Sequence, residues 1–214
     1  QIYKELSELS NYTDLDIHFD FSILEGSHGD AVDTIANLGQ TGSTNAIDSA
    51  VGTPTLDRRS LSRACVDFPN TDDNDNFLSM ASKYATTGKS MTFFIVFQWN
   101  AVQNGATLVA DAPGGYADYL QLGTGGRGRF ALAGGTATVF NTNTTNGGSI
   151  QYAPTANTPT VYLIQRTSDG VVTFFVDNNL MVTTFTLSDA NYSIGAIGGS
   201  TSGSQKDWNG KICE

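Results

Sequence analysis

Alternating apolar and polar residues recur along this chain and predict β-strands. The clearest case is Val161–Asn178, where two runs rich in β-branched and aromatic residues flank Asp169-Gly170. Because glycine tolerates a positive φ, this pair predicts the turn of a β-hairpin. The first arm alternates between two faces, with Tyr162 and Ile164 on one and Leu163 and Gln165 on the other. Neither face is fully polar, so we expect the hairpin to lie in a larger sheet that a second sheet covers.

Other segments share this composition and predict further short strands. They are Leu15–Ile23, Leu61–Phe68, Met91–Trp99, Ala106–Ala110, Tyr116–Leu122, Arg129–Leu132, Ala137–Phe140, Ile150–Tyr152, Met181–Leu187, Ser193–Ile197 and Trp208–Glu214. Residues 25–54 are rich in Gly, Asn, Ser, Thr and Asp, and predict a long irregular surface excursion. Short strands with turn signals every ~8–12 residues predict an all-β, two-sheet antiparallel jelly-roll sandwich.

The N-terminal residues differ from this pattern. Ile2, Leu6 and Leu9 lie at helical spacing, and predict a short helix or linker in residues 1–12. No composition shift follows, so residues 13–214 are expected to form a single domain. The chain opens at Gln1 rather than Met, from which we expect a processed or excised piece.

Composition narrows the classes of partner. Only 15% of the 214 residues are charged, the net charge is −10, and nearly all the acidic residues are Asp. Eleven scattered Lys and Arg give no basic surface for nucleic acid, and an acidic chain does not favour an anionic membrane surface. No apolar run approaches ~20 residues, so no membrane insertion is expected.

Two cysteines, Cys65 and Cys213, allow two interpretations. They are either buried free thiols, which behave as small hydrophobic side chains, or a disulfide between a strand in the first third and the last strand. Spacing alone does not decide between these, because a disulfide needs a specific geometry.

The sequence contains short motifs that resemble phosphate-binding or catalytic ones, but the residues around them do not fit those functions. Gly88-Lys89-Ser90 and the glycine run at 123–128 lead into strand-like segments, where no helix N-terminus can hold phosphate. His18 and His28 have Asp neighbours, but no serine lies in a G-x-S-x-G elbow. The paired-carboxylate strand pattern of glucanases is absent, and Glu is scarce. We therefore expect no enzyme activity.

One acidic cluster is a candidate metal site. Asp72, Asp73 and Asp75 lie in an Asp/Asn-rich turn with oxygen side chains at alternate positions, as in the start of a calcium loop. The glycine and glutamate of an EF-hand loop are missing, and the alternative is a solvated turn that caps itself. Calcium is the only cofactor that these residues suggest.

The segment Asp111–Tyr119 is the best candidate for carbohydrate contact. Sugars are bound by planar aromatic faces and carboxylate acceptors, and glycine lets a backbone approach closely. Asp111, Gly115, Tyr116 and Asp118 supply all three features. The alternative is an ordinary Pro-Gly turn whose tyrosines lie in the core.

Several motifs occur in the order of a known superfamily. His18–Ser22 reads aromatic-x-Asp-x-Ser, Met91–Phe97 is a long apolar strand, Phe175–Asn178 resembles a Tyr-Val-Asn-Gly arm, and Trp208–Glu214 contains Gly-x-Ile-x-Glu. Over roughly residues 15–214 the chain resembles the concanavalin A-like lectin/glucanase superfamily, in its laminin-G-like jelly-roll branch. The resemblance implies two antiparallel sheets with the first and last strands close together, which would bring Cys65 near Cys213.

The resemblance also implies a function. It implies a non-catalytic module on an extracellular or virion surface that binds a glycan or a cell-surface receptor. The alternative is a structural subunit of a virion, tail or fibre whose main role is self-association in a homo-oligomer or larger assembly.

Overall fold

The computed structural model describes most of the β-rich part of the chain: residues 15–59, 63–69, 76–86, 88, 90–100, 106–112, 115–122, 128–132, 138–141, 155–177, 179–186, 192–199 and 208–213. The segment 1–12 and the predicted strand Ile150–Tyr152 lie outside these residues. Among the described helices, none is long and apolar enough to cross a membrane.

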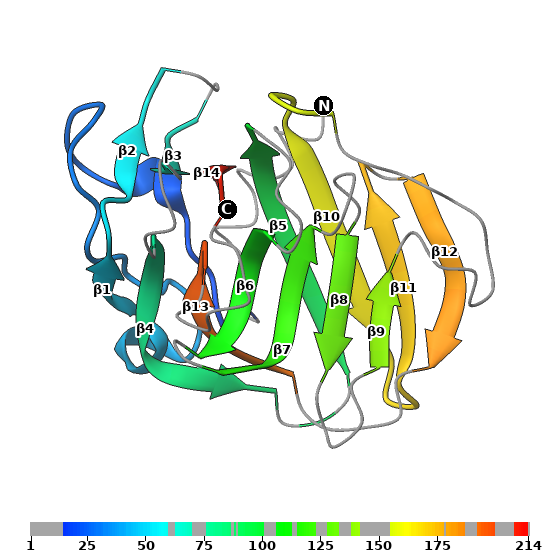
Figure 1. Ribbon diagram of the computed structural model, residues 1–214. Coiled ribbons are helices and arrows are strands. Elements are labelled where there is room, and N and C mark those ends of the chain that lie inside the picture. Colours follow the sequence, from blue (N-terminus) through cyan, green and yellow to red (C-terminus); the bar gives the residue numbers. More distant parts are fainter. Residues whose placement is uncertain are drawn as a thin grey trace.

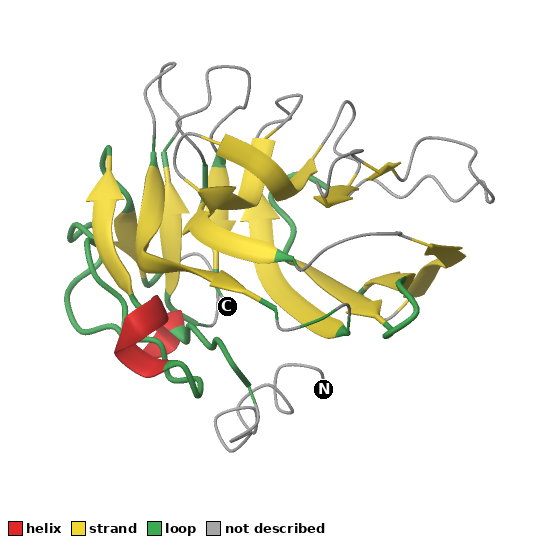
Figure 2. Cartoon of the chain, turned by 90° about the horizontal axis from the view of Figure 1, so that it is seen from below, coloured by secondary structure: helices red, strands yellow, loops and turns green. Residues whose placement is uncertain are grey.

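The described strands form two antiparallel sheets that face one another (Figures 1 and 2). Sheet A has the order β12 (Asn179–Thr186), β11 (Val171–Val176), β10 (Thr160–Arg166), β5 (Met91–Trp99), β14 (Gly210–Ile212), β3 (Cys65–Phe68), β2 (Thr55–Asp57). Sheet B has the order β1 (Ile47–Val51), β4 (Phe77–Ala85), β13 (Ser193–Ile197), β6 (Ala106–Ala112), β7 (Gly115–Leu122), β8 (Gly128–Leu132), β9 (Thr138–Asn141). The all-β sandwich is therefore confirmed.

Aromatic side chains fill the centre of the space between the sheets. Phe97 of β5 makes edge contacts with Tyr162 of β10 and with Trp208, at ring-centroid distances of 4.6 and 5.3 Å. Tyr162 also meets Phe174 of β11 edge-on at 4.9 Å. Such edge-to-face pairs add to the stabilisation that burial of the rings provides. They fix three adjacent strands of sheet A against the core.

The hairpin predicted at Val161–Asn178 is confirmed. Strands β10 and β11 pair in register, with Tyr162 opposite Val176 and Ile164 opposite Phe174. Tyr162 and Ile164 are buried in the core, whereas Gln165 on the other face is exposed. Gly170 has φ 83°, and its amide donates to the Thr167 carbonyl oxygen at 2.9 Å, which closes the turn.

The strand predicted at Leu15–Ile23 is wrong. Its last residues form a 3₁₀ turn, η2 (Phe21–Ile23), and the preceding residues belong to no strand. The apolar alternation does reach the core, because Phe19 and Phe21 are buried. The backbone is nevertheless satisfied outside a ladder: the His18 amide donates to the Asn37 side chain at 2.8 Å. The alternation of apolar and polar residues indicates which side chains are buried. It does not indicate which group accepts the hydrogen bond of each backbone amide.

Residues 25–54 are less irregular than expected. They contain β1, which pairs with β4 at the edge of sheet B. Isolated bridges join Ile35 to Ile47 and Ala31 to Thr55, so the excursion is anchored at three places along the sandwich. The burial pattern of β1 lacks a regular alternation, which explains why its sequence gave no strand signal.

The short strand β14 lies between β5 and β3 in sheet A. Gly210 pairs with Trp99 on one side and Phe68 on the other. One residue beyond the strand, Cys213 forms a disulfide with Cys65 of β3, with a Cα–Cα distance of 4.1 Å. Both cysteines are buried, and because they are bonded to each other the free-thiol interpretation does not apply.

Candidate functional site

The predicted carbohydrate-contact segment forms the hairpin of β6 and β7. The two strands meet where Ala112 pairs with Gly115, and the ladder contains register shifts on both sides of Val109 and Ala110. Leu120 and Leu122 of β7 are in the core, and Asp118 lies two residues before Leu120 on the same alternation. Asp118 therefore lies on the core-facing side of β7. The side chain of Tyr116 lies outside the described side chains.

Both carboxylates of this hairpin are held by protein groups. Asp111 is 5% exposed, and its Oδ2 atom lies 3.1 Å from the Lys83 ammonium of β4. Asp118 is 4% exposed, and its Oδ2 accepts a hydrogen bond from the backbone amide of Ser193 at 2.8 Å. Buried carboxylates require such partners. Asp111 thus joins β6 to β4, and Asp118 joins β7 to β13, in each case across one intervening strand.

The charges of both carboxylates act on the hydroxyl group of Tyr192. Its ring is buried and meets Phe93 of the other sheet edge-on at 6.3 Å. Burial raises the pKa of the Tyr192 hydroxyl well above 10, and the charges of Asp118 and Asp111 raise it further. The phenol therefore stays protonated at every physiological pH.

The proposed calcium ligands Asp72, Asp73 and Asp75 lie outside the described residues, so calcium binding stays a prediction. Among the residues that the structure describes, no group of three or more His, Cys, Asp or Glu side chains could hold a metal ion.

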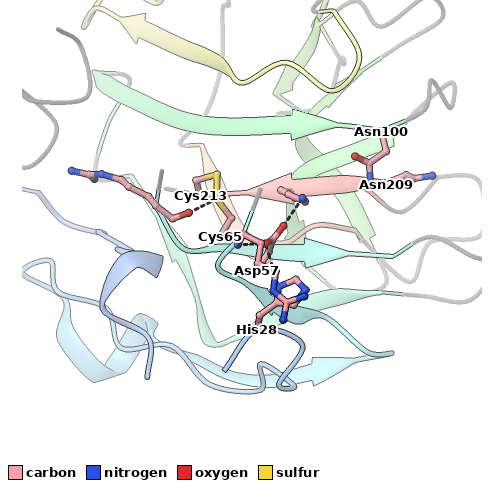
Figure 3. Close-up of polar contacts among 9 residues, drawn as sticks. His28, Asp57, Cys65, Asn100, Asn209 and Cys213 are labelled. Atoms are coloured by element: carbon pink, nitrogen blue, oxygen red, sulfur yellow. Dashed lines mark hydrogen bonds and ion pairs between the residues drawn. A yellow bond between two sulfur atoms is a disulfide. The ribbon is translucent and has the colours of Figure 1, made fainter. Parts of the chain in front are cut away.

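A second charged cluster, which the sequence did not predict, lies on sheet A beside the disulfide. Asp57 of β2 is 3% exposed and forms an ion pair with Lys211 of β14. Its other oxygen lies 3.3 Å from His28 Nδ1 and accepts the Arg59 amide at 2.7 Å. Figure 3 shows the His28 ring and the Asp57 carboxylate pointing toward one another. Asp57 and Lys211 are far apart in sequence and lie on strands separated by β3, so no local pattern could pair them.

Asp67 of β3 completes this cluster. It pairs in register with Lys211 on one side and Thr55 on the other, and its Oδ1 is buried with no hydrogen-bond partner. Burial raises the pKa of Asp67; Lys211 opposes that shift, Asp57 adds to it and His28 opposes it. The ion pairs of this cluster connect the His28 loop to β2 and β14.

Comparison with known proteins supports the architecture. No family model matches the chain, and no curated protein sequence matches it. Domain 4 of AbnA, a GH43 extracellular arabinanase from Geobacillus stearothermophilus solved in complex with arabinotriose, matches with a TM-score of 0.54 at 14% identity, over 94% of this chain and 89% of that one. The fold is concanavalin A-like.

Two further structures resemble the chain. The binding domain of Paraclostridial Mosquitocidal Protein 1 matches with a TM-score of 0.56 at 13% identity; the match covers 95% of this chain but 47% of that one, so this chain spans about half its length. The carbohydrate-binding module CBM66 from Bacillus subtilis matches with a TM-score of 0.43 at 12% identity, over 77% of this chain and 89% of that one. Neither of the two matches with a TM-score above 0.5 is described as a virion protein, so the virion interpretation gains no support.

Proposed function

We propose that this chain is a non-catalytic extracellular binding module that recognises glycans. The observation that carries the proposal is its similarity, over 94% of its length, to a domain whose structure contains a bound oligosaccharide. The Cys65–Cys213 disulfide supports an extracellular location, because disulfides persist in oxidising compartments.

The β6–β7 hairpin is the proposed ligand site. Asp111 and Asp118 are fixed by Lys83 and by the Ser193 amide before any ligand arrives. Such preorganisation reduces the entropy lost on binding. Since both carboxylates are buried, we assign direct ligand contact to Gly115 and Tyr116, and a positioning role to Asp111 and Asp118. The choice rests on residue type: a glycine backbone permits close approach of a ligand, and a tyrosine ring is a side chain that stacks on sugar rings.

A glycan array followed by calorimetric titration tests this function, with arabinotriose as the first soluble probe. We expect the wild-type chain to bind at least one glycan, and the Tyr116→Ala variant to bind it at least tenfold more weakly, because loss of one stacking contact is worth about 1.4 kcal/mol. The control is Val51→Ala, which truncates a side chain that is 38% exposed on β1, at the far edge of sheet B.

Three results would contradict the proposal. The first is a folded chain that binds no glycan and forms a stable oligomer at micromolar concentration, which would favour the self-association alternative. The second is unchanged binding by Tyr116→Ala, which would remove the hairpin from the site. The third is release of reducing ends from a polysaccharide that one carboxylate substitution abolishes, which would make the chain an enzyme.

A further inference from the structure

The outer face of sheet A carries a row of large apolar side chains contributed by four adjacent strands. Phe94 of β5 pairs with Leu163 of β10, Leu163 pairs with Phe175 of β11, and Phe175 pairs with Leu180 of β12. Their chain neighbours on these strands, such as Ile95, Tyr162 and Phe174, are in the core. Because side chains alternate across a strand, this apolar stripe (Phe94, Leu163, Phe175, Leu180) points away from the core.

The apolar stripe is partly exposed to solvent. Phe94, Leu163 and Phe175 are half-buried, and Leu180 at the edge of the sheet is 44% exposed. Residues that lie directly opposite one another on one face of a sheet are close enough for their side chains to touch. The four side chains therefore form one continuous patch. A contiguous apolar patch on a soluble protein marks an interaction site, whereas isolated apolar residues do not.

The row beside the apolar stripe is polar but uncharged. Thr92, Gln165 and Thr173 pair in register across β5, β10 and β11, and Thr92 and Gln165 are exposed. Neither this row nor the apolar stripe contains a charged side chain, although the chain carries a net charge of −10. The surface therefore combines phenyl and aliphatic groups with hydroxyl and amide hydrogen-bonding groups. That combination suits a ligand with apolar ring faces and hydroxyl edges, which is the chemistry of a sugar.

We propose that the apolar stripe binds an extended, uncharged polysaccharide lying across β5, β10, β11 and β12. Phe94 and Phe175 lie on strands two apart, a separation of about 10 Å at the usual spacing between strands. Two sugar rings of one extended chain, separated by a third, can each lie against a phenyl group at such a spacing. Thr92, Gln165 and Thr173 then hydrogen-bond to hydroxyl groups along one edge of the polysaccharide.

Charge selects this ligand over the alternatives. A second copy of the chain would bring another net charge of −10 to the interface, and polyuronates and anionic lipid surfaces would also be repelled. An uncharged polysaccharide suffers no such repulsion. This site shares the ligand class of the proposed function, but it uses none of the hairpin residues and lies on the other sheet.

Depletion binding to insoluble cellulose and insoluble neutral xylan tests the proposal, with polygalacturonate as the charged comparison. We expect the wild-type chain to bind at least one neutral polysaccharide to an extent that does not depend on salt. We expect it not to bind polygalacturonate. Leu180→Ser should weaken binding about threefold and Phe175→Ser about tenfold, because each removes apolar contact area. Leu180 is exposed at a sheet edge, so its variant remains informative if Phe175→Ser unfolds.

Two controls separate this site from the hairpin. Val51→Ser removes an apolar side chain of similar exposure from sheet B and should leave binding unchanged. Leu180→Ser should in turn retain binding of a soluble oligosaccharide whose binding Tyr116→Ala weakens. The proposal is overturned if Leu180→Ser and a folded Phe175→Ser bind like wild type, or if the wild-type chain binds neither neutral polysaccharide. It is also overturned if Leu180→Ser instead dissociates a dimer in sedimentation experiments.

Discussion

Asp57 and Asp67 lie on adjacent strands of sheet A but have different surroundings. Asp57 is paired with Lys211 and His28 and accepts a backbone amide, so its charge is well compensated. Asp67 has a buried oxygen without a partner, and burial raises its pKa. A carboxyl group whose pKa is higher in the folded state holds its proton more tightly there than in the unfolded chain. Its ionisation therefore opposes folding.

This difference predicts how stability depends on pH. As pH rises above about 3.8, the unfolded chain loses the Asp67 proton first, and the free energy of unfolding falls until the raised folded-state pKa is passed. Above the raised folded-state pKa the folded protein carries the full penalty. Asp67→Asn should therefore be more stable than wild type at pH 7 in urea denaturation, with a gain that shrinks toward pH 4.

Two comparisons make that measurement specific. Asp33→Asn, at an exposed position, should change stability little. Lys211→Met should lower the free energy of unfolding by roughly 3 kcal/mol, because it leaves Asp57 buried without its ammonium partner. A less stable Asp67→Asn at pH 7 would mean that attraction to Lys211 outweighs burial.

At the scale of elements, local signals predicted some strands and missed others. The β10–β11 hairpin was predictable because its alternation and its Asp169-Gly170 turn are adjacent in sequence. Strands β1 and β4 were not, since register shifts interrupt their ladders and with them the alternation. The Asp57–Lys211 pair depends on the strand order β2–β3–β14, which no local pattern encodes. The loops that would identify a ligand show no regular alternation of apolar and polar residues, so local sequence predicts their structure least well.

Strand β14 is sensitive to a single added methyl group. Gly210 has φ 151°, and a Cβ at this position would overlap the carbonyl oxygen of Gln98 on β5. Gly210→Ala should therefore lower the free energy of unfolding by about 2 kcal/mol or more, measured by urea denaturation. Gly88→Ala is the matched control, because nothing lies within 4 Å of its added Cβ. Equal losses in the two variants would show that close packing at β14 is not the cause.

At the scale of the whole molecule, the disulfide links residues 148 positions apart and joins the last described strand to β3. Closing so long a loop removes much of the conformational freedom of the unfolded chain. The double variant Cys65→Ala/Cys213→Ala should lose about 3–5 kcal/mol of unfolding free energy in denaturant titration. Adding a reductant to unfolded wild type should reproduce that loss. Unchanged stability in both experiments would show that strand pairing alone holds β14 in place.

The insertion of β14 between β5 and β3 has a consequence for biosynthesis. Strands β2 and β3 emerge from the ribosome early, but they reach β5 only through β14, which is translated after every other described strand. Sheet A therefore cannot be completed until the ribosome has synthesised β14 (Gly210–Ile212). Until then β3 and β5 present unpaired edges, which are the sites where nascent β-proteins aggregate. Folding of this domain is expected to finish after translation of β14, with the disulfide sealing the last strand to arrive.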